Sequence, residues 1–456
     1  MMNKIMDLTS RKGALALRIA SALRDRGHAV LFVGGCVRDY LMGKQPADID
    51  IATTAKPEEV EAIFPKTIPV GKQFGVVIVM EDDIPFEVAT FRTEGGYQDG
   101  RHPTRVEFTV PEDDARRRDF TVNGLFYDPF KQRVIDYVAG KGDIDAKLIR
   151  AIGDPVERFR EDKLRLLRAI RFASTLGFEI EKKTWDSIRT LAASIHAVSP
   201  ERIREELVKI FTRSGAARGY MLLHESGLMK EILPEVEVMK GVEQPEKFHP
   251  EGDVFEHTRI LLTYLTPPIS EVLAFSALFH DIGKPKTQAI RKGRLTFYEH
   301  SEEGAKIARE IMRRLRFSND IIEGVYQSVL NHMKFMDVKK MRSGKLKMFV
   351  VRPTFSDEMQ LHRADCLASH GMLDNYEFLL EKMKEFEHEE LKPKALVSGH
   401  DLIALGMKPG PEMKPMLGEL YELQLEGTLK GRDEALAWAQ KKITSFKPQT
   451  DGSLGT

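Results

Sequence analysis

Residues 31–53, LFVGGCVRDYLMGKQPADIDIAT, determine how the rest of the sequence is interpreted. The apolar run at 31–33 predicts a buried strand, which is followed by a glycine turn, a short helix and a second strand at 48–52. Side chains two residues apart on a strand point to the same face of a sheet. We therefore expect Asp48 and Asp50 to stand side by side on an otherwise apolar strand.

This pair of carboxylates predicts a cation site. Like charges that lie close together repel, so the arrangement is costly unless a cation lies between them. Oxygen ligands suit Mg²⁺, which proteins hold with carboxylates together with the phosphates of a substrate. The turn at Gly34 and Gly35 lets backbone N–H groups approach such a phosphate, and Arg38 can bind it. A tight turn followed by a polar edge strand is the structural alternative, and the combination of GG, RD and DID favours the site.

The composition is that of a soluble globular protein of about three domains. The 456 residues are 42% apolar and 30% charged, and 69 basic residues balance 69 acidic ones. Any nucleic-acid surface must therefore be a local basic patch. Cys36 and Cys366 lie far apart without a CxxC motif, which argues against a disulfide framework and indicates a reducing cytoplasm. The N-terminus lacks the apolar core of a signal peptide, and no run of ~18 apolar residues predicts a membrane span.

The pattern of apolar residues predicts an α+β protein, with a small mixed sheet at the front and helices behind it. A helix is expected at 8–26, and short strands dominate from 31 to about 110. Neither GxGxxG nor GxxxxGK[ST] occurs, so neither a dinucleotide fold nor a P-loop is supported. Helical periodicity follows, interrupted by loops near 241–252, 338–346 and 391–400. The last ten residues are expected to be disordered.

Three further segments of the front half are candidates for the site. Glu87 alternates with apolar neighbours, so it points away from them, and it can complete or orient a metal site if its strand adjoins 48–52. The segment 92–105, rich in glycine and charge, is expected to be a functional or mobile loop. RRRDFTVNG at 116–124 offers three arginines, Asp119 and Asn123 for contacts with a triphosphate and a ribose. A solvated helix start capped by Asp119 is the alternative.

The segment 156–173, VERFREDKLRLLRAIRFA, predicts one amphipathic helix. Asp162, Arg165, Arg168 and Arg171 recur every three residues, so they are expected on one face, beside a buried apolar stripe. Asp162 can accept a hydrogen bond from the exocyclic amine of cytosine or adenine, and Arg165 can donate to the adjacent ring nitrogen or carbonyl. Uracil and guanine present the opposite pattern and would be rejected. An unpaired buried polar group costs ~1–3 kcal/mol, which is enough for sizeable discrimination.

Three motifs in order, GGCVRD…DIDIA, RRDFTVNG and EDKLRLLRAIRF, closely resemble those of class II tRNA nucleotidyltransferases (CCA-adding enzymes) and the related bacterial poly(A) polymerases. The resemblance covers about residues 28–215. It implies a polymerase-beta-like nucleotidyltransferase head, Mg²⁺ as the cofactor, CTP and ATP as substrates, and the acceptor and T-arm minihelix of tRNA as the partner. It also implies a hinge at 142–155 and, at 201–211, a helix that braces the base-reading helix.

The resemblance assigns roles to individual residues. Asp48 and Asp50 would bind catalytic Mg²⁺, and Glu87 remains an accessory carboxylate. The residues that would hold the nucleotide are Gly35, Arg38, Arg118, Asp119, Asp162, Arg165, Arg168 and Arg171. Lys72 followed by Gln73 resembles the CCA-adding group more than the poly(A) polymerases. Enzymes that add only CC lack a segment like 92–105, so by the same resemblance its presence favours addition of A, by either a full CCA-adding or an A-adding enzyme.

A second motif, HDIGK at 280–284, resembles the HD phosphohydrolase superfamily, in which helices converge on a divalent metal. The residues that match its H…HD…D pattern are His257, His280, Asp281 and Asp365, and His300 and His332 are further candidates. In related nucleotidyltransferases such a domain either resembles a phosphodiesterase or phosphatase or only helps to hold RNA. The four residues imply a second divalent metal, and hydrolysis is a separate hypothesis.

These expectations divide the chain into a head at 1–150, a neck for nucleotide recognition at 151–240, an HD domain at 241–390 and a helical body and tail at 391–456. We expect a cytoplasmic, Mg²⁺-dependent enzyme in which the 3′-hydroxyl of tRNA attacks the α-phosphate of CTP or ATP. An enzyme that adds only A and a poly(A) polymerase are the nearest alternatives. An HD phosphohydrolase with an inactive head and a non-catalytic RNA-binding protein are alternatives of other classes.

Overall fold

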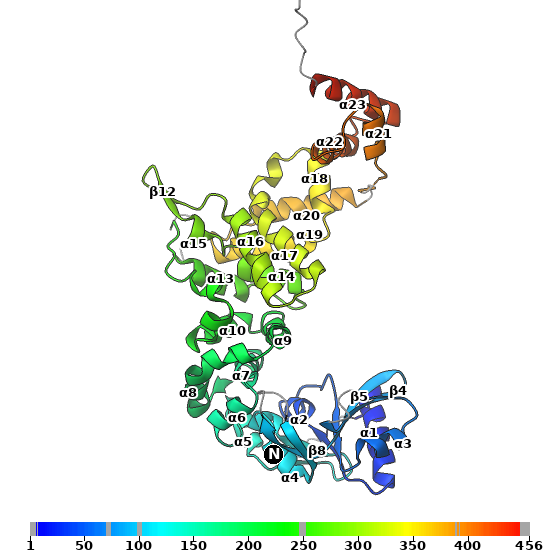
Figure 1. Ribbon diagram of the computed structural model, residues 1–456, viewed down its shortest axis with the longest axis vertical. Coiled ribbons are helices and arrows are strands. Elements are labelled where there is room, and N and C mark those ends of the chain that lie inside the picture. The colour runs from blue at the N-terminus through cyan, green and yellow to red at the C-terminus, as the bar shows by residue number, and fades with distance from the viewer. Residues whose placement is uncertain are drawn as a thin grey trace, which may run out of the picture. The chain divides into compact units, whose positions relative to one another are not determined.

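The computed structural model describes residues 6, 8–69, 74–97, 103–245, 252–387, 390–391 and 393–446. The chain forms two compact units (Figure 1). The first is Met1–Val238 with the short segments Thr266–Ile269 and Ile311–Phe317, and the second comprises the remaining residues from Met239 onward.

A seven-stranded mixed sheet organises the first unit, in the order β3-β4-β5-β2-β1-β8-β9. Strand β1 (Val30–Val33) pairs antiparallel with β2 (Asp50–Thr53) and with β8 (Leu125–Asp128). Strand β2 also pairs in parallel with β5 (Ile84–Thr90). The outer strands are β3 (Thr67–Ile68), β4 (Val76–Glu81) and β9 (Arg133–Asp136).

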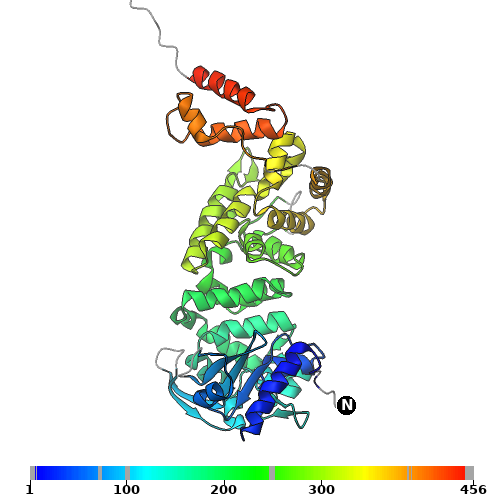
Figure 2. The same ribbon diagram turned by 90° about the vertical axis from the view of Figure 1, so that its right-hand side faces the viewer.

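Helix α1 (Arg11–Asp25) covers the centre of this sheet (Figure 2). Its apolar stripe of Leu15, Ile19 and Leu23 is buried, and it contacts β1 and β2. The side chain of Ser10 caps the helix by accepting a hydrogen bond from Gly13 N. Helix α2 (Gly35–Leu41) connects β1 to β2, and α3 (Pro57–Ile63) follows β2. All four residues of β1 are buried, so the sheet has an apolar centre.

The rest of the first unit is mainly helical, as the periodicity predicts. Its helices are α4 (Pro111–Arg116), α5 (Gly140–Asp145), α6 (Pro155–Glu161), α7 (Arg165–Leu176), α8 (Lys182–Leu191), α9 (Pro200–Phe211), α10 (Ala216–Glu225), α11 (Leu228–Ile232) and α12 (Pro234–Glu237). Strand β10 (Leu148–Ile149) pairs with β11 (Glu179–Ile180). Helix α7 buries Leu166, Leu167 and Ile170 and packs against α9 and α10.

Three sequence predictions for this unit are wrong in detail. Asp48 precedes its strand, because β2 begins at Asp50. The segment 92–105 contains β6 (Arg92–Tyr97) and the first half of β7 (Pro103–Phe108), which pair antiparallel and so satisfy each other's backbone groups. The helix predicted at 156–173 is interrupted at Asp162, whose backbone is extended with φ −137° and ψ 104°.

Several sequence predictions fall on residues outside the described ranges. These include Lys72 and Gln73, the centre of the segment 92–105, half of the linker near 241–252 and the last ten residues. The preference for a C- and A-adding enzyme that was drawn from Lys72 and Gln73 therefore stays a prediction.

The second unit is mainly helical. Its elements up to residue 386 are α13 (Val254–Thr263), α14 (Glu271–Phe279), α15 (Lys284–Thr287), β12 (Ala289–Arg291), β13 (Arg294–Thr296), α16 (His300–Arg314), α17 (Asn319–Asn331), η4 (His332–Lys340), α18 (Ser343–Val350), α19 (Phe355–Ala368) and α20 (Asp374–Phe386). The last turn of α16, from Ile311, belongs to the first unit. Helix α14 is the centre and contacts α13, α17 and α19. The prediction of a loop at 338–346 is wrong, because η4 and α18 bury Val338 and Leu346 in one apolar cluster with Phe335.

The C-terminal helices α21 (Gly399–Ala404), α22 (Met413–Leu425) and α23 (Arg432–Phe446) pack around an apolar cluster of their own. Buried Leu402, Leu420 and Ala439 contribute to it from the three helices in turn. Among the helices of the described residues, none combines the length and the apolar character that crossing a membrane requires.

Candidate active site and candidate metal centre

Asp50 and Glu87 lie beside each other on neighbouring strands. Strands β2 and β5 run in parallel register with Ile51 opposite Val88, so the two preceding residues are also adjacent. Phe86 and Val88 are buried whereas Glu87 is exposed, as the alternation along the sequence predicts. The sequence analysis expected Glu87 to take part in the metal site only if its strand adjoins the acidic strand. The pairing of β5 with β2 meets this condition.

Asp48 lies just before β2 and completes this acidic group. Its side chain is 81% exposed, and Lys12 Nζ lies 2.5 Å from its Oδ1. The charges of Glu87 and Asp48 both disfavour ionisation of Asp50, so the three carboxylates are close enough to interact. Lys12, on α1, is a cation at the site that the sequence analysis did not single out.

The pKa of Asp50 is raised to about 6, chiefly because burial disfavours the charged carboxylate, and also because Glu87 and Asp48 repel it. Arg118 and Lys12 act in the opposite direction. A bound divalent cation would offset this penalty, because it adds positive charge beside the Asp50 carboxylate. The oxygen donors of this group fit Mg²⁺.

We expect Asp50→Asn to stabilise the metal-free protein at neutral pH. The folded pKa of Asp50, about 6, exceeds its ordinary value of 3.8, so the folded state binds more protons and its stability falls as the pH rises between these values. An amide removes this penalty, and the free energy of unfolding at pH 7 should rise by about 1–2 kcal/mol. Urea unfolding in EDTA measures it, followed by Trp185 fluorescence in a Trp438→Phe background. A variant less stable than its parent at pH 7 would contradict the prediction.

The glycine turn between β1 and α2 brings two arginines together. Gly34 has φ +74°, a conformation that favours glycine. A Cβ atom at Gly34 would lie 3.3 Å from Arg118 Nη1, and one at Gly35 would lie 3.5 Å from Arg38 Nη2. The turn therefore carries guanidinium groups from two separate segments, which is the arrangement that a phosphate site requires.

Both arginines are oriented by buried or half-buried acceptors. Arg38 donates through Nε and Nη2 to Asp39 Oδ1, at 2.9 and 2.8 Å, and through Nη1 to Asn123 Oδ1 at 2.6 Å. Arg118 donates through Nε and Nη2 to Asp114 Oδ2, at 3.2 and 3.0 Å. The Asp114 side chain is only 1% exposed, and the sequence analysis missed it. The available signal was its position four residues before Arg118, the spacing of one helical turn, although α4 itself ends at Arg116.

Asp119 links the glycine turn to α7. Its Oδ1 accepts from Asn123 Nδ2 at 3.2 Å, and its Oδ2 accepts from Arg168 Nε at 2.7 Å. Because Asn123 also binds Arg38, a continuous polar network runs from α2 to α7. Burial would raise the pKa of Asp119, but Arg168 and Arg165 lower it to about 2. Asp119 thus holds other site residues in place, and its direct contact with a nucleotide stays a prediction.

We expect Asp119→Asn to destabilise the first unit. The folded pKa of Asp119, about 2, lies below its ordinary value of 3.8, so the stabilisation is complete above pH 4 and is lost as the pH falls through 2. Loss of the charge should cost about 2 kcal/mol at pH 7. The same Trp185 unfolding measurement tests this, with the exposed Glu112→Gln as the control, which should change stability by less than about 0.5 kcal/mol. Equal effects of the two variants would contradict a buried, network-forming Asp119.

Asp162 and Arg165 do not share one face of a continuous helix, contrary to the sequence prediction. Asp162 follows α6, where its Oδ1 accepts from Leu164 N at 3.1 Å and its Oδ2 from Arg202 Nη2 at 2.8 Å. Arg165 begins α7 and donates through Nη1 to Glu161 Oε2 at 2.8 Å. The break exists because Asp162 bonds the start of α7 with its side chain rather than continuing α6. Both residues still lie at the α6–α7 junction.

Helix α9 braces this junction, as the resemblance implies for 201–211. Arg202 binds Asp162, and Glu206 Oε2 lies 3.0 Å from Arg171 Nε. Burial, aided by the charge of Arg168, lowers the pKa of Arg171 to about 10. Arg202 and Glu206 were missed as individual residues, although their spacing of four within ERIREELVKIF places both on one helix face.

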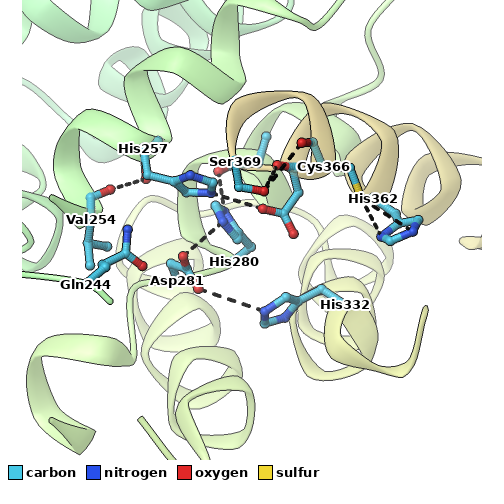
Figure 3. A network of polar contacts seen from close by, with 12 residues as sticks. Gln244, Val254, His257, His280, Asp281, His332, His362, Cys366 and Ser369 are labelled. Carbon is cyan, nitrogen blue, oxygen red and sulfur yellow. Dashed lines mark hydrogen bonds and ion pairs between the residues drawn. The ribbon is translucent and has the colours of Figure 1, made fainter. Parts of the chain in front are cut away.

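In the second unit, His257, His280 and Asp365 converge from α13, the end of α14 and α19. Their ligand atoms lie within 4.8 Å of one another, and His257 Nε2 is 3.0 Å from Asp365 Oδ1. Figure 3 shows His257 and His280 close together, with Asp281 and His332 beside them. The structure thus brings together the residues that match the H…HD…D pattern.

Asp281, His300 and His332 form a second group of the same size. Burial would raise the pKa of Asp281, but Lys284 and His280 hold it well below its usual range. Burial, with the neighbouring charges of His300 and His280, lowers the pKa of His332 to about 3. Neutral imidazoles beside ionised carboxylates are the donors that divalent transition metals prefer. Within the described residues, only these two groups bring three ligand atoms of His, Cys, Asp or Glu within 4.8 Å of one another.

The two units define a class of protein, a nucleotidyltransferase head joined to an HD domain. Three family models match the chain in that order. The Poly A polymerase head domain matches residues 30–150, the probable RNA and SrmB-binding site of polymerase A matches 177–240, and the HD domain matches 253–369.

The chain belongs to the family of CCA-adding enzymes. It is 31% identical over 437 residues to the CCA-adding enzyme of Bacillus mycoides (strain KBAB4), which covers 93% of this chain and 98% of the relative. The Bacillus stearothermophilus CCA-adding enzyme in complex with CTP is similar in structure, with a TM-score of 0.73 and 27% identity over 96% of this chain and 98% of that chain. A CCA-adding enzyme with ATP (TM-score 0.61, 18% identity) and the Thermotoga maritima CCA-adding enzyme with tRNA (TM-score 0.57, 17% identity) share the fold, each covering 96% of this chain and 99% of its own.

Proposed function

We propose that this protein adds C and A nucleotides to the 3′ end of tRNA, with CTP and ATP as substrates. Membership of the CCA-adding family over nearly the whole chain supports this reaction. Asp50 lies beside Glu87, next to the arginine-lined turn at Gly34. This arrangement is the observation that supports the head as the site of nucleotide addition.

The head residues would divide the reaction between them. Asp48 and Asp50, with Glu87 beside them, would hold Mg²⁺, which when bound activates the attacking hydroxyl and neutralises charge on the leaving pyrophosphate. The 3′-oxygen of tRNA bonds to the α-phosphorus as the bond to pyrophosphate breaks. Arg38 and Arg118 would bind the triphosphate, and their existing carboxylate contacts hold them in position beforehand.

Base selection would lie at the α6–α7 junction. Asp162 has acceptor capacity left, because a carboxylate accepts about four hydrogen bonds and its described contacts use two. Arg165 would supply the donor next to it, while Glu161 and α9 hold the pair in place. Arg168 and Arg171 support this edge through Asp119 and Glu206.

A labelled incorporation assay tests the proposal. The full chain with Mg²⁺, CTP and ATP is offered a tRNA that ends at the discriminator base, a tRNA that ends in CC and an unrelated oligonucleotide. We expect C, C and A on the first RNA, a single A on the second and a stop after each. Addition of A to the second RNA alone would indicate an A-adding enzyme, long A tails on all three a poly(A) polymerase, and no incorporation would refute the proposal.

We place the reaction in the cytoplasm, with both cysteines in the thiol form. Cys36 and Cys366 are free and buried, which fits a reducing compartment. Burial raises the pKa of both thiols to about 12, so neither is a reactive thiolate.

The two groups of histidines and aspartates favour a second activity, hydrolysis of phosphate esters in the HD domain. Water would attack phosphorus, the bond to the alcohol would break, and the proton from water would pass to the leaving oxygen. Turnover of p-nitrophenyl phosphate and of a 2′,3′-cyclic nucleotide with Ni²⁺, Mn²⁺ or Mg²⁺ tests this. We expect turnover that Asp281→Ala abolishes and the exposed His400→Ala leaves unchanged. No turnover with any of the metals would refute this second activity.

A further inference from the structure

Lys12 of α1 reaches the acidic group of the head from a distant part of the sequence. Its Nζ donates to Asp48 Oδ1 at 2.5 Å and to Ala47 O at 2.7 Å. Both bonds fall on the segment 42–49, which connects α2 to β2 without a helix or a strand of its own. The Asp48 side chain is 81% exposed, so the packing of the sheet does little to fix it. Lys12 therefore supplies the contacts that hold this carboxylate.

The chain around Lys12 is itself held in place. A Cβ atom at the next residue, Gly13, would lie 2.7 Å from Leu8 Cα, so the segment before α1 packs directly against the start of the helix. Further back, Met6 is buried and its N–H donates to Tyr127 Oη of β8 at 3.3 Å. Lys12 thus extends from an anchored helix start rather than from a fraying terminus.

The charge of Lys12 serves the acidic group rather than α1. A cation in the first turn of a helix opposes the helix dipole. The charges of Glu87 and Asp48 disfavour the ionised form of Asp50, whereas the charge of Lys12 favours it. Carboxylates that repel one another would move apart where the chain allows it, and the exposed Asp48 is the one that is free to do so. The family model of the head begins at residue 30, so α1 lies outside the segment that it matches.

We propose that Lys12 is a positioning residue for nucleotide addition, which holds Asp48 in the group with Asp50 and Glu87 so that the carboxylates are already assembled when Mg²⁺ binds. Lys12 bonds Oδ1 of Asp48, and a carboxylate has a second oxygen for the cation. A carboxylate ligand that is itself hydrogen-bonded binds a metal more tightly than one that is not. The inference rests on the proposed nucleotide addition in the head.

An ammonium group also repels a cation, so the sign of its effect on metal binding is informative. Repulsion is weak at the exposed Asp48, because water and salt screen the charge. Loss of the two hydrogen bonds, in contrast, releases both the carboxylate and the backbone before β2. We therefore expect Lys12→Met, which removes the charge and both bonds but keeps the length of the side chain, to weaken metal binding.

Binding of Mn²⁺ to the full chain, measured without any substrate, tests the proposal. Carboxylates accept Mn²⁺ as well as Mg²⁺, and the six-line electron paramagnetic resonance signal of free Mn²⁺ reports the bound fraction. Binding to the head is the part that Asp50→Asn removes. Its Kd should rise about 10-fold in Lys12→Met and stay unchanged in the control Arg11→Met, an exposed neighbour on α1. Lys12→Arg should recover most of the loss, because a guanidinium also donates to two oxygens. Unchanged or tighter binding by Lys12→Met would overturn the proposal.

Two further measurements separate positioning from other roles. In an Asp48→Ala background, Lys12→Met should weaken Mn²⁺ binding no further, and an additional loss would overturn the proposal, because Lys12 would then act through another group. The midpoint of urea unfolding should stay unchanged in Lys12→Met, since an exposed ion pair contributes little to stability. Weaker binding together with a lowered midpoint would assign Lys12 a structural role instead.

The experiment also distinguishes failure of this inference from failure of the proposed function. If Asp50→Asn removes no Mn²⁺, the head has no such cation site, and both the proposed function and the role of Lys12 are refuted. If Asp50→Asn removes Mn²⁺ and Lys12→Met leaves its Kd unchanged, only the role of Lys12 is refuted.

Discussion

Asp50→Ala should lower nucleotide incorporation by on the order of 10³-fold or more, because loss of a cation ligand removes several kcal/mol of transition-state stabilisation. Burial and the charges of Glu87 and Asp48 all disfavour the ionised form of Asp50. Of the three carboxylates, Asp50 therefore depends most on a bound cation to stay ionised. Single-turnover incorporation of labelled CTP into a tRNA that lacks CCA measures the effect. Binding of tRNA, followed by a mobility shift, should change by less than about 3-fold, because Asp50 acts on the reacting groups.

Asp83→Asn is the matched control for Asp50→Ala. Asp83 lies in the turn between β4 and β5, is exposed and has φ 61°, a conformation that asparagine tolerates. Incorporation by this variant should stay close to that of the unmodified protein. If Asp50→Ala retains more than a tenth of the activity, Asp50 is not a ligand of the catalytic cation.

The same raised pKa predicts the pH dependence of metal use. Below a pH of about 6, the protonated Asp50 cannot bind a cation, so the Mg²⁺ concentration for half-maximal rate should rise as the pH falls through that value. An unchanged Mg²⁺ requirement between pH 7.5 and pH 5.5 would contradict this role.

Asp162→Ala should keep most of the catalytic rate and lose base discrimination. The ratio of kcat/KM for CTP over UTP should fall by about 10- to 100-fold, which corresponds to the ~1–3 kcal/mol that an unpaired buried group costs. Asp162 also bonds Leu164 N at the start of α7, so the alanine variant should lose about 1 kcal/mol of stability as well. Incorporation of each of the four nucleotides into a tRNA that lacks CCA provides the measurement.

Asp162→Asn separates the two roles of this residue. Asparagine keeps an oxygen for Leu164 N, but its amide can donate to the O4 of uracil or the O6 of guanine. Discrimination should therefore fall while the hydrogen bond to Leu164 N is kept, at the cost of the charge pair with Arg202. The exposed Asp186→Ala, which removes a helix-surface pair with Lys182, is the control and should leave selection unchanged. Full discrimination by both Asp162 variants would show that bases are selected elsewhere.

Local sequence signals located the elements of the head but not the break in the base-reading segment. Period-2 alternation around Glu87 predicted its exposed side, and the apolar stripe of α1 predicted that helix. The regular spacing from Asp162 to Arg171 predicted one helix. Residue spacing alone does not show whether a side chain, here that of Asp162, forms a hydrogen bond with a backbone N–H in place of the helical one. The extended backbone at Asp162 follows from that local competition and from Arg202 of α9.

The sequence by itself determined the chemistry of this protein. The order of its motifs, the acidic pair before and on β2, the arginines beside the glycine turn and the H…HD…D pattern are all short-range features, and residue type and spacing express them directly. Only the tertiary structure decided which of these groups meet. Arg38 reaches Asn123 across 85 positions, Arg168 reaches Asp119 across 49, and Arg202 reaches Asp162 across 40. Such partners depend on strand order and helix packing, because contacts between distant segments leave no periodic signal in a single sequence.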